Sequence, residues 1–130
     1  TAKILLYSDD RTTREQVRLA LGRRGAADLP EIEVYDVATQ AAVLAAVDAG
    51  GLDRLILDAE ATPSGGLGLA KQLKDEIADC PPIVVLIIRV ADAWLATWSR
   101  ADATVVYPVD PVRLPTAVAA VLRAGLSQAV

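Results

Sequence analysis

Residues 83–88 form an unbroken run of Ile, Val and Leu, and this run constrains the fold more than any other segment of the chain. A strand that is buried on both faces has this pattern, whereas a strand with one solvated face alternates apolar and polar residues. Pro81 and Pro82 precede the run and would end a helix before it. The run therefore predicts an interior strand in a sheet that helices cover on both faces.

Shorter apolar runs elsewhere alternate with helical patterns. They predict strands at residues 3–7, 32–37, 55–57 and 105–106. They also predict five helices: one with Thr12 or Thr13 as its N-cap, one over 39–50, one whose inner face carries Leu69, Leu73 and Ile77, one over 92–101 and one that begins at Asp110. This alternation predicts an α/β fold of the flavodoxin-like, doubly wound (βα)5 type, with a five-stranded parallel sheet and helices on both faces. Because the chain has 130 residues, we expect a single domain over 1–130.

The composition excludes several kinds of functional site. The sequence has no His and one Cys, so it cannot provide His-dependent nucleophilic catalysis, a His-ligated zinc site or an internal disulfide. The net charge of −4 disfavours nucleic acid as a partner. No apolar run approaches the ~18 residues of a membrane helix, and no secretory leader pattern opens the chain. We therefore expect a cytoplasmic protein in which Cys80 is an inert thiol.

Acidic residues follow two of the expected strands. Asp9 and Asp10 follow the first strand, and Asp58 follows the third. The carboxyl ends of parallel strands meet at one edge of the sheet, where ligands commonly bind. Ionised carboxylates that gather there repel one another unless a cation offsets their charge, and Mg²⁺ commonly binds one or two carboxylates together with water. The pattern predicts a magnesium site; the alternative is that Asp9 or Asp10 merely caps the following helix.

Over nearly its whole length the chain resembles the receiver domain of bacterial two-component response regulators. The matching segments are residues 3–10 (KILLYSDD), 55–58 (LILD) with Gly66 eight residues on, 82–87 (PIVVLI) and 105–111 (VVYPVDP). The resemblance implies that Asp58 accepts a phosphoryl group from a histidine kinase. It also implies that Mg²⁺ is bound by the carboxylates of Asp9, Asp10 and Asp58 and by the backbone carbonyl of Glu60.

Three positions depart from the family pattern. Ile87 stands where the family has Thr or Ser, Tyr107 stands where it has Lys, and Thr104 stands where it has an aromatic switch residue. A phosphoryl group on Asp58 would lack the hydroxyl and the ammonium group that hold it in the family. We therefore expect an atypical receiver, or pseudo-receiver, with no enzymatic activity. It would act mainly through protein–protein interaction, with a histidine kinase or another signalling protein as partner, and phosphorylation would be weak or dispensable.

Two other functions remain open. The chain could be a working phospho-acceptor in which Tyr107 and Arg89 serve a modified site, with Arg89 and Glu60 forming a gate; alternatively, Arg89 is a solvated loop residue. The chain could also be a small flavodoxin-like enzyme or cofactor carrier, but no glycine-rich phosphate loop follows the first strand. Gly65 and Gly66 lack the rest of a phosphate-binding motif, so they indicate only a turn.

Trp94 and Trp98 lie four residues apart on the helix expected over 92–101. We expect one ring to belong to the core and at least one to expose an edge. Family members use the fourth helix, fifth strand and fifth helix for dimers and partners, so an exposed Trp predicts a homodimer or partner interface there; the alternative is simple packing. The resemblance also implies a cis peptide bond between Tyr107 and Pro108.

Overall fold

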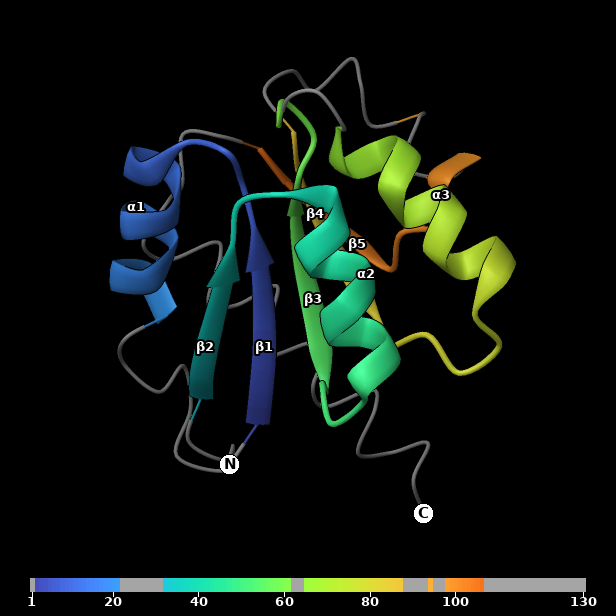
Figure 1. The fold of residues 1–130 in the computed structure, drawn as a ribbon. Coiled ribbons are helices and arrows are strands. Elements are labelled where there is room, and N and C mark those ends of the chain that lie inside the picture. The colour runs from blue at the N-terminus through green and yellow to red at the C-terminus, as the bar shows by residue number, and fades with distance from the viewer. Residues whose placement is uncertain (1, 22–31, 62–64, 88–93, 95–97, 107–130) are drawn as a thin grey trace.

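The computed structural model describes residues 2–21, 32–61, 65–87, 94 and 98–106. The strands are β1 (Ala2–Tyr7), β2 (Ile32–Val37), β3 (Arg54–Asp58), β4 (Ile83–Ile87) and β5 (Ala103–Val106), and the helices are α1 (Arg11–Leu21), α2 (Gln40–Ala49) and α3 (Gly66–Glu76). The strands form one five-stranded sheet in the order β2-β1-β3-β4-β5. All neighbouring strands are parallel, so their arrowheads point to the same edge (Figure 1). The predicted flavodoxin-like α/β fold is confirmed.

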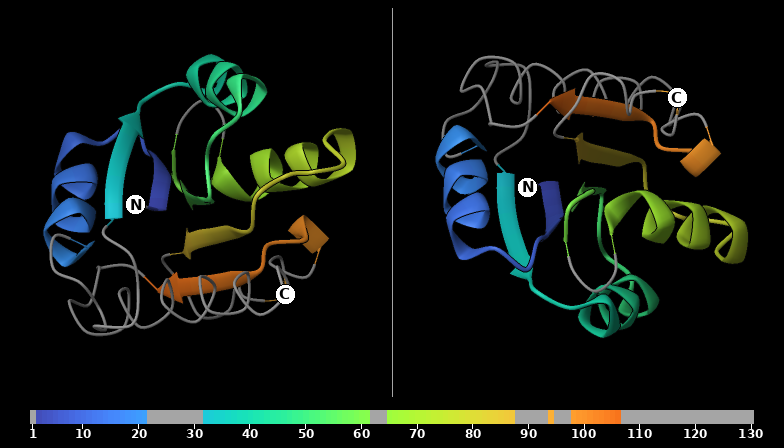
Figure 2. Two further views of the ribbon diagram at one scale, coloured as in Figure 1. Left: turned by 90° about the horizontal axis from the view of Figure 1, so that it is seen from below. Right: turned by 90° about the horizontal axis from the view of Figure 1, so that it is seen from above.

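Helices cover both faces of this sheet. Helix α1 lies on one face, and α2 and α3 lie on the other (Figure 2). Alternate residues of β1 divide between the two cores: Ile4 and Leu6 pack towards α1 with Val17, whereas Leu5 and Tyr7 pack towards α2 and α3. Burial on both faces explains the unbroken apolar run of β4, where every residue from Ile83 to Ile87 is at most 1% exposed.

The first helix begins at Arg11, two residues earlier than Thr12 as N-cap predicts and three residues earlier than Thr13 predicts. Asp10, rather than Thr12 or Thr13, caps α1, because its Oδ1 accepts a hydrogen bond from the Thr12 N–H at 3.0 Å. A carboxylate at this position satisfies an orphan amide and also favours the positive end of the helix dipole. The second helix matches its expected limits: Thr39 caps α2 through the Ala42 N–H, and Gly50 ends it with φ +77°.

The helix expected over residues 92–101 is only partly within the described residues, and it does not reach Ala101. Residues 98–99 are helical, and Arg100 then adopts φ +64°, a left-handed conformation that ends a helix. Trp94 is 69% exposed and Trp98 is 52% exposed, so the expectation that one ring belongs to the core is wrong. The expected exposure of a ring is confirmed. The helix expected from Asp110 and the Tyr107–Pro108 bond lie outside the described residues.

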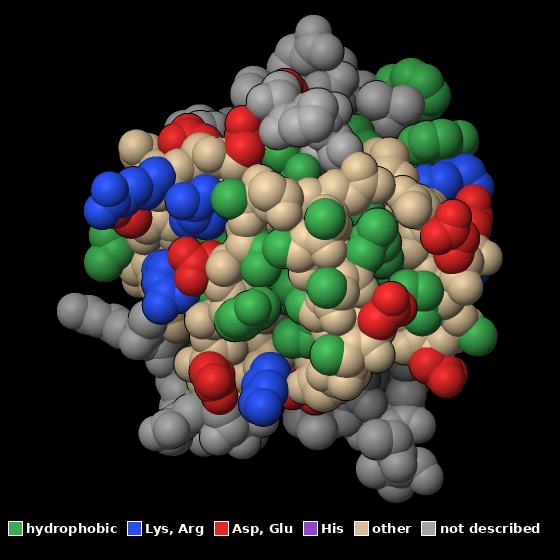
Figure 3. Space-filling model, in the orientation of Figure 1, with side chains coloured by type: hydrophobic (Ala, Val, Ile, Leu, Met, Phe, Trp, Pro, Cys, Tyr) green, Lys and Arg blue, Asp and Glu red, His purple; other side chains and the backbone are tan. Residues whose placement is uncertain are grey.

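A small pocket lies at the amino-terminal edge of the sheet, far along the strands from Asp58. It has a volume of about 250 Å³ and is lined by residues that include Lys3, Tyr35, Ala46 and Leu52. On the face of the molecule that Figure 3 draws, hydrophobic side chains are scattered over the middle and charged side chains lie around them. None of the helices in the described ranges is long and apolar enough to cross a membrane.

Candidate functional site

Asp58 is the last residue of β3, and its carboxylate is held by two hydrogen bonds. Asp58 is buried, with only 8% of its surface exposed. Its Oδ1 accepts a hydrogen bond from the Glu60 N–H at 2.8 Å, and its Oδ2 accepts one from the Ser8 hydroxyl at 2.7 Å. The backbone beyond the strand is anchored to β4, since the Ala59 N–H donates to the Leu86 carbonyl. Asp58 therefore has a fixed position and a satisfied carboxylate.

Ser8 contacts Asp58 directly, and the sequence analysis did not single it out. In the parallel pairing of β1 and β3, Tyr7 is level with Leu57, so the next residues, Ser8 and Asp58, are level as well. Ser8 is fully buried. Its position directly after the apolar run of the first strand was the available signal.

The two acidic residues after Ser8 have different surroundings. Both carboxylate oxygens of Asp10 accept hydrogen bonds from α1: Oδ1 from the Thr12 N–H, and Oδ2 from the Thr13 hydroxyl at 3.1 Å. Asp9 is exposed. Burial raises the pKa of the Tyr7 phenol, and the negative charges of Asp9 and Asp58 raise it further. Asp9 and Asp58 thus act on the same buried hydroxyl, whereas Asp10 caps α1.

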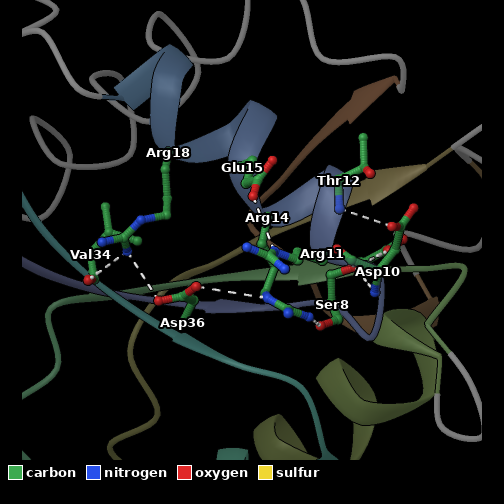
Figure 4. A network of polar contacts seen from close by, with 10 residues as sticks. Ser8, Asp10, Arg11, Thr12, Arg14, Glu15, Arg18, Val34 and Asp36 are labelled. Carbon is green, nitrogen blue, oxygen red and sulfur yellow. Dashed lines mark hydrogen bonds and ion pairs between the residues drawn. The ribbon is translucent and has the colours of Figure 1, made fainter.

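A network of ion pairs and hydrogen bonds holds Ser8 in place from the side of α1 and β2 (Figure 4). The Arg14 guanidinium donates to the Ser8 carbonyl at 2.7 Å and lies 3.7 Å from the Asp36 carboxylate on β2. Arg18 pairs with the same carboxylate at 3.1 Å. The Ser8 N–H donates to the Val37 carbonyl at the end of β2. The backbone at Ser8 is therefore tied to β2 and to α1.

Gly65 and Gly66 form a close contact rather than only a turn. Gly65 is the N-cap of α3, and Gly66 is its first residue. A Cβ on Gly66 would lie 2.7 Å from the Asp58 carbonyl oxygen, and one on Gly65 would lie 2.7 Å from the Ala59 carbonyl oxygen. Both distances are far below normal contact, so the absence of side chains lets α3 begin directly against the end of β3.

Only some of the remaining predicted site residues lie within the described part of the chain. Ile87 ends β4 and is buried, Thr104 is half-buried in β5, and Glu60 is exposed beside Asp58. Arg89 and Tyr107 lie outside the described residues, and with them the proposed gate. Among the residues that are described, no three His, Cys, Asp or Glu side chains converge into a group able to hold a metal ion.

Comparisons with known proteins identify the family. No family model matches the sequence. Over 122 residues the chain is 56% identical to an uncharacterised response regulatory protein of Mycobacterium tuberculosis strain CDC 1551. The aligned region covers 94% of this chain and 92% of the relative, and an uncharacterised response regulatory protein of strain H37Rv gives the same values. The chain belongs to the response regulator family. It is a receiver domain, the signalling domain of two-component systems.

Solved structures with low sequence identity share the fold of this response regulator. A chemotaxis response regulator of Vibrio cholerae superposes with a TM-score of 0.78 at 21% identity, covering 94% of this chain and 99% of that one. The signal receiver domain of a histidine kinase from Syntrophus aciditrophicus gives a TM-score of 0.80 at 21% identity, covering 95% of this chain and 92% of that one. At these identities the likeness extends to the fold alone.

Proposed function

We propose that this receiver domain is atypical: it signals mainly through protein–protein contacts, and phosphorylation of Asp58 is weak or dispensable. The observation that carries the proposal is the state of the Asp58 carboxylate, whose two oxygens are both hydrogen-bonded within the chain. Ile87, at the end of the neighbouring strand, offers a buried alkyl group instead of a hydroxyl. We take residues 1–130 as one receiver domain and the cytoplasm as its location.

The chemistry of phosphorylation explains why these surroundings matter. When a phosphoryl donor such as acetyl phosphate reacts, an Asp58 oxygen forms a bond to phosphorus, the bond from phosphorus to the acetate oxygen breaks, and acetate leaves with the electron pair. The product carries close to two negative charges. Glu60 follows Asp58 by two residues, and the charge of Asp9 acts on the same Tyr7 hydroxyl as that of Asp58. The phosphoryl group therefore enters a negative environment that disfavours it.

We propose Mg²⁺ as a ligand of the oxygen groups around Asp58. Asp58 and Asp9 supply carboxylates and Glu60 a backbone carbonyl, and each Asp58 oxygen keeps a second lone pair beyond the hydrogen bond that it accepts. The carboxylate of Asp10, the fourth group expected to bind the ion, is directed at the beginning of α1, where it accepts from the Thr12 N–H and the Thr13 hydroxyl. We therefore assign the main ligand role to Asp9, Asp58 and the Glu60 carbonyl. A bound ion would offset the negative charge at this edge of the sheet.

Metal binding and phosphorylation should be separable in the purified protein. We expect Mg²⁺ to bind at millimolar concentration in a calorimetric titration, because carboxylates remain at the site. With acetyl phosphate and saturating Mg²⁺, we expect slow, substoichiometric labelling of Asp58 by intact-protein mass spectrometry. Asp58→Asn is the control that assigns any added mass to this residue.

The alternative function, a working phospho-acceptor, makes the opposite prediction. Rapid stoichiometric labelling that disappears in Asp58→Asn would replace our proposal with that alternative, in which Arg89 and Tyr107 complete a modified site. A calorimetric titration without heat of binding would instead remove Mg²⁺ from the proposal and leave the signalling role to protein contacts.

The exposed tryptophans support an interaction surface at the carboxyl-terminal part of the described chain. Trp94 and Trp98 both present their rings to solvent, and the Lys71 ammonium lies 5.7 Å from the centre of the Trp98 ring. Large aromatic side chains contribute strongly to protein interfaces when a partner covers them. We propose that this face, with β5, binds a histidine kinase, another signalling protein or a second copy of the chain. The net charge of −4 argues against nucleic acid.

Trp98→Ala should weaken self-association or partner binding and change the free energy of unfolding little, since the ring is half exposed. Light scattering over a concentration series measures self-association, and urea unfolding measures stability. Leu19→Ala is the matched control, because Leu19 is an exposed apolar residue on α1, 80% exposed and away from the tryptophans. Equal effects of both variants, or a loss of stability alone in Trp98→Ala, would contradict the interface.

A further inference from the structure

The side chain and backbone of Ser8 join Asp58 to the beginning of α1. The hydroxyl donates to Asp58 Oδ2 at 2.7 Å and accepts from the Asp10 N–H at 3.1 Å. The carbonyl accepts from Arg14, and the N–H donates to Val37. Every polar group of this fully buried residue is therefore engaged. The hydroxyl proton has two acceptors within reach, Asp58 Oδ2 and, at 3.5 Å, the Asp10 carbonyl, and the much shorter contact favours Asp58.

We propose that Ser8 is a positioning residue that restrains the reactivity of Asp58, an inference that rests on the proposed function and names one cause of the weak phosphorylation. The hydroxyl stabilises the negative charge of the carboxylate before reaction. As an Asp58 oxygen bonds to phosphorus, negative charge leaves the carboxylate, so a hydrogen bond to it weakens. An interaction that is stronger in the ground state than in the transition state slows the reaction.

Loss of the hydroxyl should leave Asp58 in place. The carboxylate keeps its hydrogen bond from the Glu60 N–H, and the end of β3 stays anchored through the Ala59 N–H to β4. The Ser8 hydroxyl therefore stabilises the negative charge of the carboxylate more than it fixes where the carboxylate lies. The salt-bridged Arg14 holds the Ser8 backbone, which fixes the point from which the hydroxyl reaches Asp58.

The test compares the rate of Asp58 labelling by acetyl phosphate in the whole chain and its variants. We expect Ser8→Ala to label about five to ten times faster than the unmodified protein, the difference between a charged and a neutral hydrogen bond. Ser8→Thr retains a hydroxyl and should restore the slow rate. Thr13→Val is the matched control: it removes a hydroxyl that hydrogen-bonds another carboxylate of the same loop, that of Asp10, and should leave the rate unchanged.

Three outcomes separate the inference from the proposed function. Slow labelling of the unmodified protein with no acceleration in folded Ser8→Ala would overturn the role of Ser8 and leave the proposed function intact. Rapid labelling of the unmodified protein would overturn both. If Thr13→Val accelerates labelling as much as Ser8→Ala, general loosening of the loop is the cause and the inference fails. In the absence of a phosphoryl donor, circular dichroism checks the fold of each variant and calorimetric titration checks its Mg²⁺ binding. If Ser8→Thr does not fold, the labelling rates of Ser8→Ala and Thr13→Val are compared instead.

Discussion

Gly66→Ala should destabilise the protein by about 1–3 kcal/mol, the usual cost of forcing extra atoms into a close-packed site. The new Cβ would lie 2.7 Å from the carbonyl oxygen and 2.8 Å from the carbonyl carbon of Asp58. These are backbone atoms of a central strand, hydrogen-bonded to its neighbours, so they cannot move aside as a flexible side chain could. Relief requires α3 to shift away from β3, and urea unfolding measures the cost.

The same substitution two residues later provides the control. Gly68 lies in α3 with open space where its Cβ would stand, and its φ is in the ordinary range. Gly68→Ala should therefore stabilise the protein by about 0.5–1 kcal/mol, because alanine loses less backbone entropy in a helix. The two variants should change the unfolding midpoint in opposite directions. A neutral Gly66→Ala would mean that α3 does not begin against the acceptor strand.

The parallel sheet could be predicted from sequence because burial on both faces leaves a direct mark on the residues. The apolar run that becomes β4 requires no knowledge of its partners. The Asp58 position could be predicted for the same reason, since a charged residue ends an apolar strand. The close approach at Gly66 could not, because the neighbour of a glycine in space is set by how α3 docks on β3 and not by the local sequence.

The role of Ser8 depended on strand register. In the sequence Ser8, Asp9 and Asp10 follow one another after the first strand, and only the two acids suggest a role beside Asp58. Only the pairing of Tyr7 with Leu57 makes Ser8 the residue level with Asp58. The expectation that one tryptophan ring belongs to the core was wrong, since Trp94 and Trp98 are both exposed. Their spacing of four residues would have predicted this for a helix, because such residues share one face.

Asp102→Ala should destabilise the protein by about 1–3 kcal/mol, the usual cost of leaving a buried donor without a partner. The Asp102 carboxylate accepts a hydrogen bond from the N–H of Ile83, the fully buried first residue of β4, at 2.7 Å. It also pairs with the Lys74 ammonium of α3 at 2.8 Å. The same residue donates its N–H to the Ile83 carbonyl. Asp102 thus joins the beginnings of β4 and β5 to α3.

Asp102→Asn separates the two contributions of this carboxylate. The amide oxygen can still accept from the Ile83 N–H, whereas the charge that attracts Lys74 is gone. Because the Asp102 side chain is 38% exposed, solvent screens that ion pair, and we expect Asp102→Asn to cost less than about 1 kcal/mol. Thermal or urea unfolding of both variants measures the difference. If Asp102→Asn is as costly as Asp102→Ala, the ion pair to α3 stabilises the fold more than the hydrogen bond that begins β4, and the carboxylate contributes mainly through its charge.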